Sequence, residues 1–132
     1  EIAFKYQLMF EKREIALLAY NSETVLAEKI ETIIARNITN TRMRDFYDIH
    51  ILLKSYTDQI NYKILTLAFN ATSVKRGTKN LMINAEALFD ELANDADMMK
   101  LWKRYQDNNN YANELLWNDV VNSVKSLYLK IR

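Results

Sequence analysis

Residues 22–36 read SETVLAEKIETIIAR, and residues 41–56 read TRMRDFYDIHILLKSY. In both stretches apolar side chains recur every three or four positions, a spacing that places them on one face of an α-helix. We expect one helix from Asn21 or Ser22 to about Ile38 and a second from about Thr41 to Tyr56. These two segments therefore favour a mainly α-helical fold.

Helical spacing continues toward the C-terminus and predicts a bundle of about five to six helices. Further helices are expected from about Asn61 to Lys75, from Asn84 to about Ala93, from Asp95 to about Tyr105 and from about Tyr111 to Ile131. The apolar residues expected to be buried in these helices include Ile64, Leu65, Leu67, Ala68, Ala71, Met98, Met99, Trp102 and Leu116. Gly77 follows a basic helix end, where a left-handed cap is typical.

Residues 2–10 differ from the rest, because apolar and polar side chains alternate there. Alternation is typical of a half-buried strand, and a second apolar run follows a polar break at residues 11–13. We expect a β-hairpin over residues 1–20. Because a lone hairpin is marginal in water, it should belong to a larger sheet or pack on the helices. The chain is thus divided into residues 1–20 and a helical domain over residues 21–132.

The composition excludes several classes of protein. The 132 residues include one glycine, no proline and no cysteine, and the formal net charge is +1. A P-loop and a Rossmann fingerprint both need several glycines, and disulfides or thiolate metal sites need cysteine. No apolar run approaches the ~20 residues that span a bilayer, and no signal peptide is visible, so we expect no membrane partner and a cytoplasmic location. Because the chain begins at Glu1 within strand-like residues, we expect it to be part of a longer protein.

Charged residues lie where the helical wheel predicts an apolar face. Arg42 and Asp45 fall in the apolar sector of residues 41–56, and Asp48 lies at its edge, while Lys29 flanks the apolar stripe of the preceding helix. Charges on a core-facing sector are costly unless they are paired or functional. Two interpretations stay open. Either Arg42 and Asp45 form a structural ion pair, or Lys29, Asp45 and Asp48 line a pocket between two antiparallel helices. In such a pocket lysine suits a phosphate, and aspartate suits a base or a hydroxyl acceptor.

Other candidate residues give weaker evidence for a functional site. His50 is the only histidine and has no second ligand beside it, so we expect a packing or surface residue rather than a metal ligand. The basic stretch Arg36, Arg42 and Arg44 either meets nucleic-acid phosphate or is a solvated helix junction. Residues 95–97 have the letters of an Asp-x-Asp pair, but we interpret them as a helix cap.

Two segments of the chain resemble a known family. Residues 20–36, YNSETVLAEKIETIIAR, resemble the "ETxLAEKxxAxxxR" segment of AbiEii-type abortive-infection toxins. Residues 40–49, NTRMRDFYDI, are similar to the "RxxDxYD" segment of the same family. The pairing of the two segments at this spacing is specific, and residues 101–106 also look like the C-terminal helices of the family.

The resemblance implies a nucleotidyltransferase-like toxin of bacterial toxin–antitoxin and phage-defence systems. It implies that the hairpin over residues 1–20 belongs to the sheet of an N-terminal lobe, upstream of Glu1, in which a Gly-Ser turn and an Asp-x-Asp pair bind Mg²⁺. The chain would then be the C-terminal helical part of the protein, with no metal ligand of its own and no transfer activity alone.

The resemblance also implies roles for individual residues. Lys29 would contact the nucleoside triphosphate (NTP), and Asp45 would be the downstream catalytic or structural aspartate. Asp48, Arg42 and Arg36 would support the nucleotide site. The partners implied are an NTP, an RNA acceptor and an antitoxin. The alternative is a non-catalytic helical binding module that docks an antitoxin or another partner.

Overall fold

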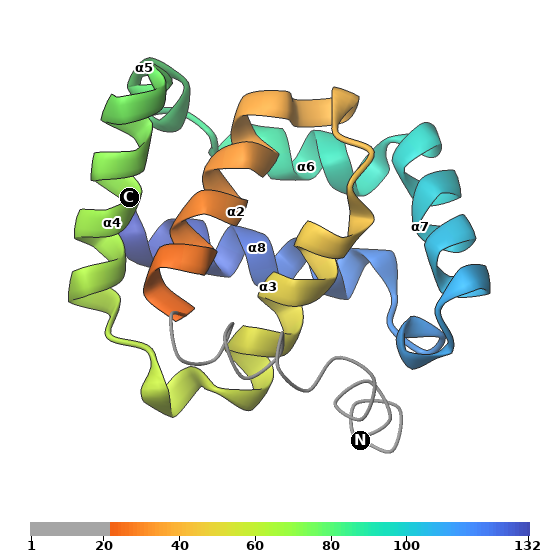
Figure 1. Ribbon diagram of the computed structural model, residues 1–132. Coiled ribbons are helices and arrows are strands. Elements are labelled where there is room, and N and C mark those ends of the chain that lie inside the picture. The colour runs from red at the N-terminus through yellow and green to blue at the C-terminus, as the bar shows by residue number, and fades with distance from the viewer. Residues whose placement is uncertain (1–21) are drawn as a thin grey trace.

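The computed structural model describes residues 22–132, and within this range the chain is helical, with no strand. The α-helices are α2 (Ser22–Arg36), α3 (Met43–Ser55), α4 (Tyr62–Arg76), α5 (Lys79–Met82), α6 (Glu86–Asn94), α7 (Ala96–Asn108) and α8 (Trp117–Ile131) (Figure 1). Three short 3-10 helices, η1 (Asn37–Thr39), η2 (Thr57–Gln59) and η3 (Asn110–Ala112), join them. The predicted mainly α fold is confirmed. The predicted hairpin lies outside the described residues.

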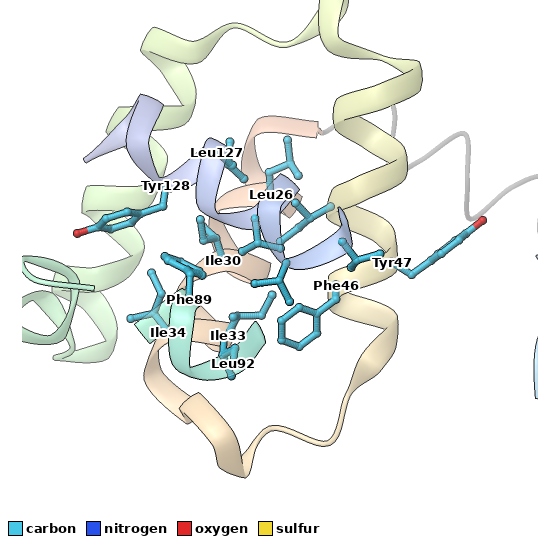
Figure 2. Packing of buried hydrophobic residues seen from close by; sticks show 14 of the residues in the cluster. Leu26, Ile30, Ile33, Ile34, Phe46, Tyr47, Phe89, Leu92, Leu127 and Tyr128 are labelled. Carbon is cyan, nitrogen blue, oxygen red and sulfur yellow. The ribbon is translucent and has the colours of Figure 1, made fainter. Parts of the chain in front are cut away.

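The helices pack around one continuous hydrophobic core. The chain rises along α2, crosses over and returns along α3, and α8 passes across both of them (Figure 1). α8 contacts α3, α4 and α6, and α2 packs most extensively on α4. Figure 2 shows Leu26, Ile30 and Ile33 of α2 in one buried cluster with Phe46 of α3 and Leu92 of α6. No helix among the described residues is long and apolar enough to cross a bilayer.

Side chains and a glycine cap several helix ends where the sequence predicts a boundary. Asp95 Oδ1 accepts a hydrogen bond from the Met98 amide at 2.9 Å and so caps α7. Asn61 Oδ1 accepts one from the Ile64 amide at 3.1 Å and caps α4. Gly77 ends α4 in the left-handed region with φ 71°, which confirms the predicted cap. α2 ends at Arg36 instead of Ile38, because Asn37 turns the chain with φ 55°.

Two predicted helix starts were wrong, and one short helix was not expected. α6 begins at Glu86, preceded by Ala85 as its cap, instead of at Asn84. α5, a single short helix, was not predicted and fills the segment between α4 and α6. The last helix begins at Trp117 instead of Tyr111. The side-chain amide of Gln106 donates hydrogen bonds to the backbone carbonyls of Ala112, Asn113 and Leu115. These carbonyls therefore have donors without the hydrogen bonds of a helix.

The predicted buried stripe of α4 was wrong at Ile64, Leu67 and Ala71, whereas Ala68 packs against the core as expected. Leu65 is buried, as expected, but its partners on the inner face are Phe69 and Ser73. Ile64, Leu67 and Ala71 are exposed, because α4 carries apolar residues on two opposite faces and packs on α2 and α8 with only one. Met99 and Leu116 are exposed as well, whereas Met98 and Trp102 are buried as predicted.

Candidate functional site

Lys29 of α2 lies between two carboxylates of α3. Its ammonium Nζ donates a hydrogen bond to Asp45 Oδ1 at 3.1 Å and lies 3.0 Å from Asp48 Oδ2. The Lys29 side chain is 16% exposed, while those of Asp45 and Asp48 are 2% and 5% exposed. The three residues that the sequence placed on neighbouring helix faces therefore form one cluster between the helices. We refer to Lys29, Asp45 and Asp48 as the charged cluster.

Local structure explains why α3 can carry two buried carboxylates. Asp45 stands in the first turn of α3 and Asp48 one turn later, close to the positive end of the helix dipole. The turn before α3 is closed by Asn40, whose Oδ1 accepts a hydrogen bond from the Arg42 amide at 3.0 Å. On α2, Lys29 is half-buried next to the buried Ile30, and its ammonium reaches both carboxylates.

Arginines on the surface complete the charge balance. Arg42 Nη2 lies 3.5 Å from Asp45 Oδ1, and Arg44 Nε lies 3.6 Å from Asp48 Oδ2. Burial raises the pKa of the Asp48 carboxyl, and the nearby Lys29 and Arg44 oppose that rise. Asp45 Oδ2 is buried and has no hydrogen-bond partner among the described residues. An unpartnered buried carboxylate oxygen is costly in a folded protein.

Two adjoining pockets open beside the charged cluster. The first has a volume of about 180 Å³ and is lined by Lys29, Asp45 and Arg42 together with Val25, Glu28, Thr32 and Arg76. The second, of about 370 Å³, is lined by Glu31, Thr32, Ala35, Arg36, Arg42 and Arg76. Thr32, Arg42 and Arg76 line both. Of the five predicted site residues, four thus line these pockets, and Asp48 lies behind them against Lys29.

Arg76 was not predicted as a site residue. It ends α4, and its Nη1 lies 2.5 Å from Oε1 of the buried Glu31 and 3.2 Å from Thr32 Oγ1, both on α2. Thr78 Oγ1 donates to the other carboxylate oxygen of Glu31 at 2.8 Å. In the sequence Arg76 reads as a basic helix end, and only the packing of α4 on α2 brings it to the pockets.

The described residues do not form a metal site. No group of three or more His, Cys, Asp or Glu side chains within residues 22–132 could hold a metal ion. Asp45 and Asp48 each give an oxygen to the Lys29 ammonium, whereas Mg²⁺ needs several oxygen ligands of its own. The donor set of the charged cluster therefore does not fit Mg²⁺.

His50 lies outside the cluster. It is buried in α3 and its Nδ1 lies 2.7 Å from Ser123 Oγ of α8. Burial lowers its pKa, and the nearby Lys54 lowers it further. His50 is thus a packing residue between α3 and α8, one of the two roles expected from the sequence.

Comparison with protein families gives a match over most of the chain. Residues 2–123 match the family model described as "Nucleotidyl transferase AbiEii toxin, Type IV TA system". Neither the curated proteins nor the solved structures with which the chain was compared gave a match. The matched region includes the charged cluster, both adjoining pockets, the described helices from α2 to α7 and α8 as far as residue 123.

Proposed function

The chain belongs to the AbiEii family of nucleotidyl transferase toxins of type IV toxin–antitoxin systems, and from this membership we propose that its charged cluster forms part of the nucleotide site. In this proposal Lys29 binds the triphosphate of an NTP. The observation that carries it is the Lys29 ammonium, held 3.0–3.1 Å from two buried carboxylates at the wall of a pocket. A lysine fixed in this way presents its charge in one direction. It therefore binds a phosphate more favourably than a solvated, mobile lysine does.

Each member of the cluster has a distinct part in the proposal. Asp45 orients Lys29 through Oδ1, and its second oxygen, Oδ2, which is buried and has no partner among the described residues, accepts a hydrogen bond from a hydroxyl of the acceptor when the acceptor binds. Asp48 holds Lys29 from the other side. In the lining of the first pocket, Lys29, Arg42 and Arg76 outnumber the carboxylates of Glu28 and Asp45, and this balance favours an anionic ligand.

The second pocket suits the acceptor. This pocket is lined by Arg36, Arg42 and Arg76. One guanidinium group can donate hydrogen bonds to two phosphate oxygens at once. We therefore assign these arginines to the phosphates of an RNA acceptor. Nucleotidyl transfer in such proteins depends on Mg²⁺, and because the charged cluster does not fit this ion, the proposal places its carboxylate ligands outside residues 22–132. Membership of a type IV system further implies an antitoxin as a partner of the protein.

The substitution Asp45→Asn in the intact toxin tests the proposal. Asparagine keeps the size of the side chain, and Asp48 still neutralises Lys29, so the fold should persist. Without the Asp45 charge Lys29 is no longer fixed, and we expect labelled-nucleotide transfer to fall about 100-fold, because misplacing a catalytic group costs a factor of this size. Asp90→Asn is the matched control, since it removes a carboxylate from an exposed ion pair with Lys125. Full activity and full toxicity of Asp45→Asn would contradict the proposal.

A second candidate function is a binding module in which the charged cluster only joins α2 to α3. The observation that favours it is that every charge of the cluster has an opposite charge within 3.6 Å. Replacing a paired set by apolar residues is often tolerated. If the cluster is structural, the double substitution Arg42→Met with Asp45→Leu should leave toxicity unchanged. If the nucleotide proposal holds, the same variant should be folded and inactive.

A further inference from the structure

α4 has two apolar faces, and only one of them is covered. Leu65, Phe69 and Ser73 face inward, where they are buried against the rest of the molecule. On the opposite side Ile64, Leu67, Ala71 and Val74 are exposed. We refer to these four residues as the outer seam of α4. Exposed apolar side chains that share one helix face are typical of surfaces that meet a partner.

The spacing of the outer seam indicates what kind of partner it fits. Its residues follow one another at intervals of three, four and three positions, which is the alternation of positions a and d in a coiled-coil heptad. With this spacing the seam stays in line over about 15 Å of helix and forms knobs and holes for a second helix. A groove of about 500 Å³ runs beside it, lined by Leu67 and Phe69 of α4, Met82 of α5 and Ile131 of α8.

The charged side chains in the segment that contains the seam are all positive. From residue 59 to residue 85 the chain has no Asp or Glu. Lys63 and Lys75 stand at the two positions that flank an a–d seam, and Lys79 lines the groove. None of these three lysines has an ion-pair partner among residues 22–132. The flanks of the seam therefore lack the carboxylates with which such lysines pair in coiled coils.

We propose that the outer seam docks an amphipathic helix of a partner protein, with apolar residues at its own a and d positions and Glu or Asp at the flanking positions. A second copy of this chain fits less well, because pairing two α4 helices would bring lysines together without a carboxylate between them. A lipid surface fits less well too, because the seam is narrow and has a groove beside it, whereas a membrane favours a broad apolar face. The proposal does not depend on the nucleotide site.

A designed peptide tests both the apolar and the charged part of the proposal. The probe is a labelled synthetic helix of about three heptads with Leu at a and d and Glu at the flanking positions. Its binding to the 132-residue chain is measured by fluorescence anisotropy. We expect saturable binding that Leu67→Glu weakens by about tenfold or more, the effect of losing a central anchor. Leu116→Glu is the matched control, because Leu116 and Leu67 are both 67% exposed.

Charge reversal provides the second arm. The double substitution Lys63→Glu and Lys75→Glu should weaken binding of the acidic peptide and favour a peptide with Lys at the flanking positions. Lys100→Glu, on the exposed side of α7, serves as its control. Absence of binding, or equal binding of both peptides to the parent chain, would overturn the proposal. So would a dimer in sedimentation that Leu67→Glu dissociates, or Leu67-dependent binding to phosphatidylserine vesicles without binding of the peptide.

Discussion

His50 is buried between α3 and α8, where Lys54, Asp119 and Ser123 surround it. Burial and Lys54 hold its pKa below the ordinary value of 6.5, although Asp119 opposes this shift. Below about pH 6.5 the unfolded chain binds a proton that the folded chain resists. The contribution of His50 to the free energy of unfolding is therefore complete above that pH and is lost as the pH falls toward the folded-state pKa.

We predict that His50→Gln weakens this pH dependence. The free energy of unfolding, measured with urea at about pH 7 and about pH 5.5, should fall less in the variant than in the parent chain. Asp48, whose pKa burial raises, has the opposite dependence on pH, but it is present in both proteins and cancels in the comparison. Parallel loss of stability in the two proteins would exclude His50 as the source.

The ion pair of Glu31 and Arg76 should contribute to the free energy of unfolding. Glu31 is buried, and Arg76→Met would leave its carboxylate with Thr78 as its remaining hydrogen-bond donor. We expect a loss of about 1–3 kcal/mol in the free energy of unfolding. Adding Glu31→Met should destabilise by less than the sum of the two single effects, as a double-mutant cycle measures. The exposed pair Lys103–Asp107 is the control, and breaking it should cost at most about 0.5 kcal/mol.

The residues of the charged cluster could be predicted from the sequence, whereas the neighbouring pair of Glu31 and Arg76 could not. Lys29, Asp45 and Asp48 could be identified because charge on an apolar helix face is unusual, and because their segments resemble a family. The pair of Glu31 and Arg76 joins residues 45 positions apart, so no local pattern reports it. In the sequence Arg76 is a basic residue at a helix end, and nothing in this local pattern indicates its contact with α2.

At the scale of secondary structure, the end of α4 connects the fold to the site. Gly77 has φ 71°, and the turn that it forms brings the Thr78 amide within 2.9 Å of the Ser73 carbonyl. The same turn places Thr78 Oγ1 on Glu31. We predict that Gly77→Ala lowers the free energy of unfolding by about 1 kcal/mol, because a side chain disfavours this φ. A Cβ at Gly77 would meet no atom within 4 Å, so backbone conformation is the sole cause.

Gly77→Asn is the control for this prediction, since asparagine tolerates the left-handed region and should cost less. Urea midpoints at an unchanged slope would measure both effects. Equal stability of the alanine variant and the parent chain would contradict the argument.

The caps of Asp95 and Gly77 were predictable because each depends on a few neighbouring residues. The buried face of α4 was not. Its apolar residues lie on two faces, and the choice between them is made by α2 and α8, which the local pattern does not contain.

At the scale of the whole molecule, aromatic rings join helices that are far apart in the sequence. The rings of Trp102 in α7 and Trp117 in α8 have centroids 5.7 Å apart, and Phe46 of α3 lies 5.0 Å from Trp117. The indole of Trp117 donates to the Leu92 carbonyl at the end of α6 at 2.9 Å. Because these are the only two tryptophans of the chain, its fluorescence reports on the junction of α3, α6, α7 and α8.

This placement of the tryptophans tests whether residues 21–132 form one domain, as the sequence predicts. If they do, the urea transition seen by tryptophan fluorescence should coincide with the helix transition seen by circular dichroism. Leu127→Ala, at a fully buried position of α8, should then lower stability by about 2–5 kcal/mol and shift both transitions equally. Leu129→Ala, at an exposed position of the same helix, should shift neither appreciably. A fluorescence transition at lower urea than the helix transition would mean that α7 and α8 separate before α2 and α4, and the single-domain prediction would then be wrong.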